Sequence, residues 1–338
     1  MHMADALLSP SVAGTMYVAS AGAAAYSIKK IKSDSELEKI PLMGVMGAFV
    51  FATQMLNFTI PGTGSSGHLC GGMLLSALLG PFAGFLTMIG VLFIQALFFA
   101  DGGLLALGAN VWNMAFYGCF IGSLLIWRPF MKKGASRAKI ILASVLGCVL
   151  TLQLGAFSVT VQTLASGITE LPFGLFVATM QPIHLAIGTV EGLITAAVLI
   201  FIYEARPEFL WGIGQKDVSV KKAKMSKKVT LGILGAVAVF FAGVLSLFAS
   251  AFPDGLEWSM EKVAGTAEPE VATGIHSFME KIQSATSFLP DYAFKDNEAA
   301  AGTSVSGIVG GILVLLLLVG ISSLVRLISK KNSTKDKE

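Results

Sequence analysis

Long apolar runs separated by short polar segments fill most of the chain between residues 6 and 328. A transmembrane helix needs about 20 mainly apolar residues to cross roughly 30 Å of hydrocarbon. Seven runs meet this requirement and lie at residues 6–28, 40–60, 108–127, 139–165, 175–203, 229–251 and 304–328. The run over 69–100 is too long for one span and is interrupted by Gly80-Pro81, so it predicts two more helices, the first of them short. The pattern predicts nine spans and an all-α integral membrane protein.

Composition supports the bilayer as the main solvent of this chain. Hydrophobic residues make up 54% of the 338 positions and charged residues only 13%, too few to cover a water-facing surface. Cys70, Cys119 and Cys148 lie in or beside apolar runs without C-x-x-C spacing, so neither a zinc ribbon nor a disulfide framework is indicated. The sequence has no basic patch interleaved with aromatic residues, which argues against nucleic-acid binding.

Basic residues orient the predicted spans. They cluster after the first, fifth, seventh and ninth spans, in segments that begin at Lys29, Arg128, Arg206 and Arg326. These segments share one side of the membrane if nine spans alternate, and the positive-inside rule makes that side the cytoplasm. We therefore expect a multi-pass protein of the plasma membrane with its N-terminus outside and its C-terminus in the cytoplasm.

The polar segments also divide the chain. Residues 206–228 are rich in Lys and predict a cytoplasmic linker between two modules. We expect a seven-helix bundle over 1–205 and a two-helix hairpin over 229–338, whose acidic loop over 252–303 lies outside the cell. The fold class expected is thus all-α, with a seven-helix bundle plus a C-terminal two-helix hairpin.

The first two residues, Met1 and His2, form an unusual candidate chelate. The free α-amine and the amide nitrogen of His2 close a five-membered ring with a metal, and that amide with the imidazole Nδ1 closes a six-membered ring. Ni(II) and Cu(II) favour such planar nitrogen sites, whereas Zn(II) prefers a tetrahedron. The first apolar run has no basic segment before it, since the first Lys is Lys29, so it does not resemble a cleaved signal. The alternative interpretation of His2 is a solvated terminal residue.

His68 is the candidate for a fourth nitrogen. It follows the glycine-rich loop over 61–67, which the charge pattern places on the same outer side as Met1. Glycine allows the loop backbone to approach the Met1-His2 segment closely. A lone histidine before a helix also serves as a capping or interface residue, and both interpretations stay open at this point.

Other polar residues have competing interpretations. His184 and Glu191 lie inside the predicted span over 175–203, where they form helix contacts or line an interior path. Asp5 either orients an imidazole or caps the first helix. His276, in the outer acidic loop, is expected to be solvated.

Absent motifs narrow the function classes. The sequence contains no G-x-x-x-x-G-K-[ST], so the chain cannot hydrolyse ATP through a P-loop. It contains neither H-E-x-x-H nor G-x-S-x-G, which argues against the familiar metalloproteases and serine hydrolases. A transporter component fits this pattern better than an enzyme, and any ATP-driven motor must be another chain.

Two sets of motifs resemble a known family. The first set consists of Met1-His2-Met3-Ala4-Asp5-Ala6-Leu7-Leu8-Ser9-Pro10, Asn57-Phe58, Gly64-Ser65-Ser66-Gly67-His68-Leu69, Gly71-Gly72 and Ala109-Asn110. They resemble the CbiM/NikM-type substrate-specific subunit of energy-coupling-factor nickel and cobalt transporters, over residues 1 to about 205. Pro253-Asp254-Gly255-Leu256-Glu257-Trp258 resembles the signature of the small companion subunit of these systems, the CbiN/NikN or PDGLE type. We name residues 229–338 the companion module.

The resemblance implies a metal-capturing component that works with a transmembrane coupling subunit and two cytoplasmic ATPase subunits. It implies that Met1 supplies its amine, His2 its amide and imidazole nitrogens, and His68 its imidazole, to Ni(II) or Co(II). The transported ion is the substrate, and no cofactor is expected. The fused form favours nickel. The alternative is a stand-alone secondary permease that uses His184 and Glu191 as a proton relay.

Overall fold

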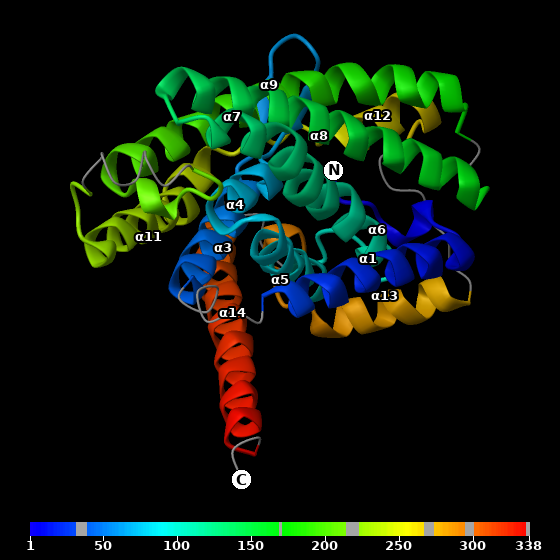
Figure 1. Ribbon diagram of the computed structural model, residues 1–338. Helices are drawn as coiled ribbons and strands as arrows, with labels where there is room; N and C mark the ends of the chain where they lie inside the picture. The colour runs from blue at the N-terminus through cyan, green and yellow to red at the C-terminus, as the bar shows by residue number, and fades with distance from the viewer. Residues whose placement is uncertain (32–38, 169–170, 214–222, 267–273, 295–300, 336–338) are drawn as a thin grey trace.

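The computed structural model describes residues 1–31, 39–168, 171–213, 223–266, 274–294 and 301–335, which are mostly helical (Figure 1). The predicted linker over 206–228 and outer loop over 252–303 therefore lie partly outside the described residues. The principal helices are α1 (Pro10–Lys30), α3 (Ile40–Gln54), α4 (Gly72–Leu79), α5 (Pro81–Phe99), α6 (Leu107–Asn110), the π-helix η2 (Val111–Trp127), α7 (Arg128–Lys132), α8 (Arg137–Ser166), α9 (Phe173–Ala205), α11 (Lys227–Gly243), α12 (Gly255–Ala264), α13 (Ile275–Thr286) and α14 (Ala301–Lys335). Short 3₁₀ segments are η1 (Asp5–Leu7), η3 (Pro207–Phe209), η4 (Leu245–Phe248) and η5 (Pro290–Tyr292), and the strands are β1 (Phe58–Ile60) and β2 (Ser65–Gly67).

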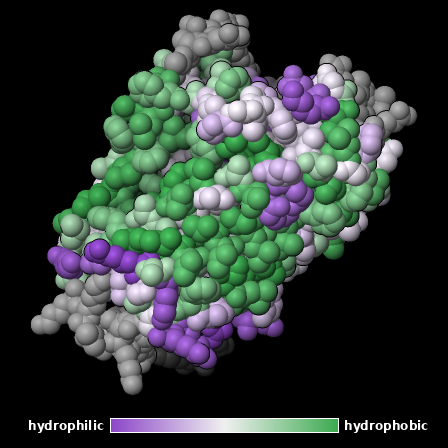
Figure 2. Space-filling model, turned by 90° about the horizontal axis from the view of Figure 1, so that it is seen from above, coloured by the Kyte–Doolittle hydropathy of each residue, from purple (hydrophilic) through white to green (hydrophobic). Residues whose placement is uncertain are grey.

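The prediction of a helical membrane protein is confirmed at this level. Within the described residues, six helical segments are long and apolar enough to cross a membrane: Pro81–Phe99, Leu107–Lys132, Arg137–Ser166, Phe173–Ala205, Lys227–Phe248 and Ala301–Ile321. Large apolar side chains on α8 and α9 are exposed, among them Leu142, Leu146 and Leu193. Figure 2 shows broad hydrophobic areas on one face of the molecule, as expected where lipid is the solvent.

One predicted span is shorter in the structure than the sequence predicts. The run over 40–60 was expected to form one helix, but α3 ends at Gln54 and the chain turns into the antiparallel pair β1–β2, in which Phe58 faces Gly67. The break at Gly80-Pro81 is confirmed, because α4 ends at Leu79 and α5 begins at Pro81. Gly80 has a φ of 83°, which favours glycine, and Pro81 has no N–H to continue the first helix.

Helix packing brings the His68 segment into the centre of the bundle. α8 and α9 run side by side, and η2 packs against α4 and α8 (Figure 1). A Cβ on Gly118 of η2 would lie 2.9 Å from the Cα of Gly72, so only glycines allow this close crossing of η2 and α4. α4, which follows His68 directly, is therefore held deep between other helices.

The companion module packs against α3, α5, α9 and the strand β2 of the N-terminal part of the chain. α11 and α14 pack on α3, α12 packs on α9 and β2, and α13 packs on α5. Figure 1 shows α14 projecting from the body with the C-terminus at its far end, whereas the N-terminus lies among the helices. The two predicted modules thus share an extensive interface around the first residues of the chain.

Candidate metal-binding site

The N-terminal segment is buried and held by main-chain and side-chain bonds. The Asn110 amide clamps Met3, accepting from its N–H at 2.7 Å and donating to its carbonyl at 3.1 Å. Gly103 N–H donates to the same carbonyl at 2.9 Å. Only 6% of Met1 is exposed, so the α-amine is presented to the interior and not to water.

Asp5 has a role that neither expectation described. Its Oδ1 accepts a hydrogen bond from Ala106 N at 2.9 Å, and Ser9 is the residue whose side chain caps α1. Asp5 therefore ties the N-terminal segment to the loop before α6.

The glycine-rich loop also differs from the prediction. A Cβ on Gly67 would meet Ile187 of α9, so the glycine allows close approach to α9 and not to the Met1-His2 segment.

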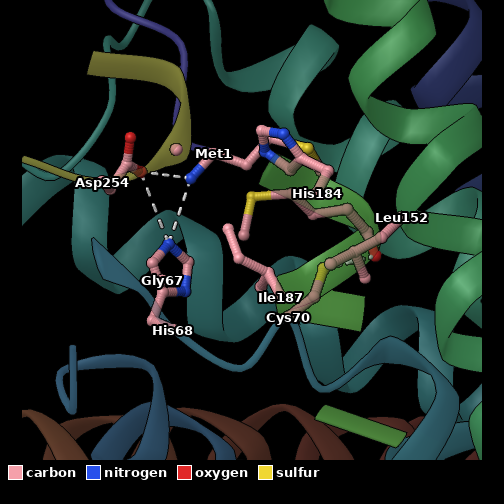
Figure 3. A pocket seen from close by; sticks show the side chains of 10 residues that line it. Met1, Gly67, His68, Cys70, Leu152, His184, Ile187 and Asp254 are labelled. Carbon is pink, nitrogen blue, oxygen red and sulfur yellow. Dashed lines mark hydrogen bonds and ion pairs between the residues drawn. The ribbon is translucent and has the colours of Figure 1, made fainter. Parts of the chain in front are cut away.

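The structure brings the Met1 amine and the His68 imidazole together. Met1 N lies 3.1 Å from Nε2 of His68, although the two residues are 67 positions apart (Figure 3). Nδ1 of His68 lies 3.0 Å from the carbonyl oxygen of Leu69, which can only accept. Nδ1 must therefore carry the proton, and Nε2 directs its lone pair at the amine.

The His2 ring completes the cluster but holds other partners. It stacks on the His68 ring with 5.2 Å between centroids and an interplanar angle of 22°. Its Nε2 lies 3.2 Å from Oε1 of Gln95, and its Nδ1 lies 3.0 Å from Oδ1 of Asp101. Chelation through Nδ1 therefore requires the metal to replace the Asp101 contact.

A relay of two glutamines defines the tautomer of His2. Gln54 donates through Nε2 to the carbonyl oxygen of Cys70 at 2.8 Å, and Gln95 donates through Nε2 to Oε1 of Gln54 at 2.9 Å. This leaves only Oε1 of Gln95 facing His2, so His2 must donate from Nε2. Burial, helped by the Met1 amine and His68 and opposed by Asp101, lowers the pKa of His2 to about 4, so the neutral ring keeps the lone pair on Nδ1.

The companion module contributes Asp254, a residue that sequence reasoning did not assign to the site. Its Oδ2 forms an ion pair with the Met1 amine and lies 3.7 Å from Nε2 of His68 (Figure 3). Burial alone would raise the pKa of Asp254, but the Met1 ammonium and His68 outweigh it and hold that pKa well below its usual value. Burial likewise disfavours the Met1 ammonium, yet the Asp254 charge raises its pKa. A metal that takes this amine must therefore displace a proton.

His184 and Glu191 lie near this cluster in different roles. His184 lines the same small cavity as Met1, His68 and Asp254 (Figure 3). Its Nδ1 bonds to the Met180 carbonyl oxygen at 2.8 Å, and its Nε2 has no hydrogen-bond partner among the described atoms. Glu191 accepts from the backbone N–H groups of Cys70 and Gly71, at 2.9 Å each, where the chain enters α4. Glu191 thus anchors the segment that follows His68.

His276 of α13 contacts the N-terminal segment near the site. His276 is not solvated as expected, because it is buried and its Nε2 bonds to the Leu8 carbonyl oxygen at 2.8 Å. Among the described residues, no group of three or more His, Cys, Asp or Glu side chains could hold a metal ion.

Comparison with known proteins identifies the family. The model of the CbiM family, described as the cobalt uptake substrate-specific transmembrane region, matches residues 2–209. The chain belongs to the CbiM family. A PDGLE domain model matches residues 228–327 of this CbiM-family chain. The protein is thus a substrate-specific membrane component of a nickel/cobalt transporter and not an enzyme.

Relatives cover nearly the whole CbiM-family chain. A putative fused nickel transport protein NikMN from Archaeoglobus fulgidus is 36% identical over 94% of this chain and 96% of its own length. A fused nickel transport protein NikMN from Rhodobacter capsulatus is 29% identical over 98% and 99% of the two chains. The crystal structure of a truncated transition metal transporter superposes with a TM-score of 0.53 at 30% identity, covering 60% of this chain and 99% of that one.

Proposed function

We propose that the protein captures nickel for an ATP-dependent energy-coupling-factor importer and binds the ion in a planar nitrogen site. The ligands are the Met1 amine, the His2 amide and Nδ1, and Nε2 of His68. Nickel is favoured over cobalt because the full-length relatives are named as fused nickel transport proteins. A d⁸ Ni(II) ion prefers four nitrogens in a plane, and this chelate offers them.

One observation carries the proposal: the 3.1 Å separation between Met1 N and Nε2 of His68. Neighbouring corners of a planar metal site lie about this far apart, since Ni–N bonds are close to 2 Å, as for Zn–N. The lone pair of His68 Nε2 is directed at the amine by the Leu69 bond, and the glutamine relay leaves the Nδ1 lone pair of His2 available. Both imidazoles are therefore in the tautomer that the chelate needs.

The wider architecture belongs to the same proposal. A seven-helix bundle over 1–205 binds the substrate, residues 206–228 form a cytoplasmic linker, and the companion module over 229–338 spans the membrane twice. The N-terminus and the loop over 252–303 face outwards, and the C-terminus is cytoplasmic. A transmembrane coupling subunit and two ATPase subunits drive release inwards. The contact between Asp254 and Met1 supports a common outer side for the N-terminus and this loop.

The test of the site is an N-terminal extension by one residue, which removes the amine chelate but preserves every side chain. The purified protein is expected to retain about one Ni(II), and the extended chain, His2→Ala and His68→Ala are expected to retain none. The same residue added at the C-terminus is the matched control, and intact-mass measurement verifies the first residue. Wild-type metal content in the extended chain would refute the chelate.

The alternative, a proton-coupled permease using His184 and Glu191, has weaker support. Both carboxylate oxygens of Glu191 accept backbone hydrogen bonds, which suits an anchor better than a proton carrier. Uptake by this chain alone, in cells without the coupling and ATPase subunits, would favour the permease.

A further inference from the structure

The two carboxylate oxygens of Asp254 have separate partners. Oδ1 caps α12, accepting from Leu256 N at 2.7 Å and from Glu257 N at 2.9 Å. Glu257 accepts in return from Asp254 N at 2.9 Å, which completes a capping box. The cap fixes the orientation of the carboxylate, and Oδ2 is left directed at Met1 and His68.

Other contacts hold the Asp254 segment against the bundle formed by residues 1–205. Ser66 N donates to the Pro253 carbonyl oxygen at 2.8 Å, and Trp258 Nε1 donates to the Thr63 carbonyl oxygen at 3.0 Å. Gly255 lies directly on α9, where a Cβ would come within 3.1 Å of His184 Cε1 and 2.9 Å of Ile187 Cδ1. The motif is therefore clamped on both sides of Asp254, by the His68 loop and by α9.

A divalent cation that approaches the Met1 amine first meets the Asp254 carboxylate. The amine nitrogen is already engaged in the ion pair with Oδ2 of Asp254. A carboxylate oxygen offers negative charge and lone pairs to the dication before the amine nitrogen is released from this pair. Because Oδ2 contacts both the amine and His68, a cation held there is already beside two of the proposed nitrogen ligands.

We propose that Asp254 is a metal-contacting residue of the loading step, an oxygen ligand that receives the incoming divalent ion and delivers it to Met1 and His68. This inference rests on the proposed function of the N-terminal site. The delivery is favourable because late transition metals such as Ni(II) bind nitrogen donors more strongly than a single carboxylate. The amine proton leaves to solvent as the nitrogen takes the metal.

Asp101 is the other carboxylate in the cluster, but its contacts suit a different task. Its Oδ1 contacts Nδ1 of His2 at 3.0 Å, and its Oδ2 accepts from the Tyr292 hydroxyl at 2.5 Å. Asp101 thus contacts one proposed nitrogen ligand, whereas Oδ2 of Asp254 contacts the Met1 amine and lies 3.7 Å from Nε2 of His68, so a cation held by Asp254 is beside two proposed ligands. We therefore assign the loading role to Asp254 alone.

The test compares the rate and the extent of Ni(II) loading in the purified full-length protein. Asp254→Asn retains an Oδ1 acceptor for the cap but replaces the charged oxygen with an amide, and Asp254→Ser retains an N-cap while its side chain is too short to reach Met1. Both variants are expected to load at least about tenfold more slowly, within the 10–10³-fold range attributed to electrostatic focusing in clefts, and to reach the wild-type metal content. Glu261→Gln removes one charge from an exposed position of the same helix and is expected to load at the wild-type rate.

Equal loading rates for Asp254→Asn and the wild type would overturn the inference. Loss of the final metal content at an unchanged melting temperature would also overturn it, because Asp254 would then be a ligand of the final site. The N-terminal extension separates the two proposals. If the extended chain still fills with Ni(II) while Asp254→Asn fills slowly, the assigned nitrogen site is wrong and the role of Asp254 stands.

Discussion

Nε2 of His2 lies 3.2 Å from Oε1 of Gln95, at the end of a hydrogen-bond relay that starts at the carbonyl oxygen of Cys70. The direction of the relay is fixed at its origin, since a carbonyl can only accept. In a neutral imidazole, when one ring nitrogen donates, the other ring nitrogen carries the lone pair. The relay therefore connects the backbone just beyond His68 to the tautomer of His2 that the proposed chelate uses.

The first prediction concerns this relay. Gln95→Leu removes the acceptor for His2 Nε2 and is expected to weaken Ni(II) binding about 10–100-fold, the usual effect of losing a partner that orients a metal-binding histidine. Competition with a chelator of known affinity measures the change. Gln153→Leu is the matched control, because the Gln153 side chain donates to the Gln181 carbonyl oxygen at 2.8 Å, between α8 and α9. Equal affinities for the two variants would contradict the role of the relay.

The second prediction concerns Glu191. Glu191→Ala leaves the N–H groups of Cys70 and Gly71 buried without acceptors, each at a cost of about 1–3 kcal/mol. We expect a lower melting temperature in detergent and, since the His68 segment loses its anchor, weaker Ni(II) binding. Glu204→Ala on the same helix breaks partly exposed ion pairs with Arg137 and Lys224, and each pair is expected to contribute no more than about 1 kcal/mol to stability. An unchanged melting temperature for Glu191→Ala would contradict the anchoring role.

The third prediction concerns the docking of the companion module on the β1–β2 hairpin. The hydroxyl oxygens of Thr59 and Ser250 lie 3.0 Å apart, so cysteines at both positions are expected to form a disulfide under mild oxidation. Mass spectrometry of the digested protein detects the linked peptides, and each single cysteine is the control. A membrane-impermeant maleimide should label Thr59→Cys in intact cells. Labelling only after permeabilisation would contradict the outer location.

The fourth prediction concerns metal-linked stability. Ni(II) at 100 times its dissociation constant should stabilise the folded protein by about 2.7 kcal/mol, provided that the unfolded chain does not bind it. A thermal melt with and without Ni(II) measures the shift, which should disappear in His68→Ala. Mg(II) at the same concentration is the control, because it prefers an octahedron of oxygen ligands. A shift that survives in His68→Ala would place the bound metal elsewhere.

The helical character and the Gly80-Pro81 break were predictable because they depend on local sequence. Apolar runs report directly on spans, and a glycine–proline pair ends a helix wherever it occurs. The run over 40–60 misled because its apolar residues continue past Gln54 into β1, and short apolar runs do not distinguish strand from helix. Hydropathy therefore located the elements better than it located their ends.

The proximity of Met1 to His68 was predicted from charge patterns that placed both on one side of the membrane. The contribution of Asp254 was not predicted, because its role depends on an interface between residues 253 positions apart. His276 was expected in solvent for the same reason: its acidic loop looks water-facing, yet α13 covers the N-terminal segment and buries the ring. The sequence did contain one signal of this interface. Asp254 is a residue type that caps helices, and the glycine after it allows the start of α12 to approach another helix closely.

The burial of the α-amine decides how this protein can be handled. A purification tag or fluorescent label at the front of the chain would occupy the space that the amine shares with Asp254 and His68. The last helix, α14, carries the other end of the polypeptide away from the helical body (Figure 1). Labels fused there leave the amine free for the proposed chelate.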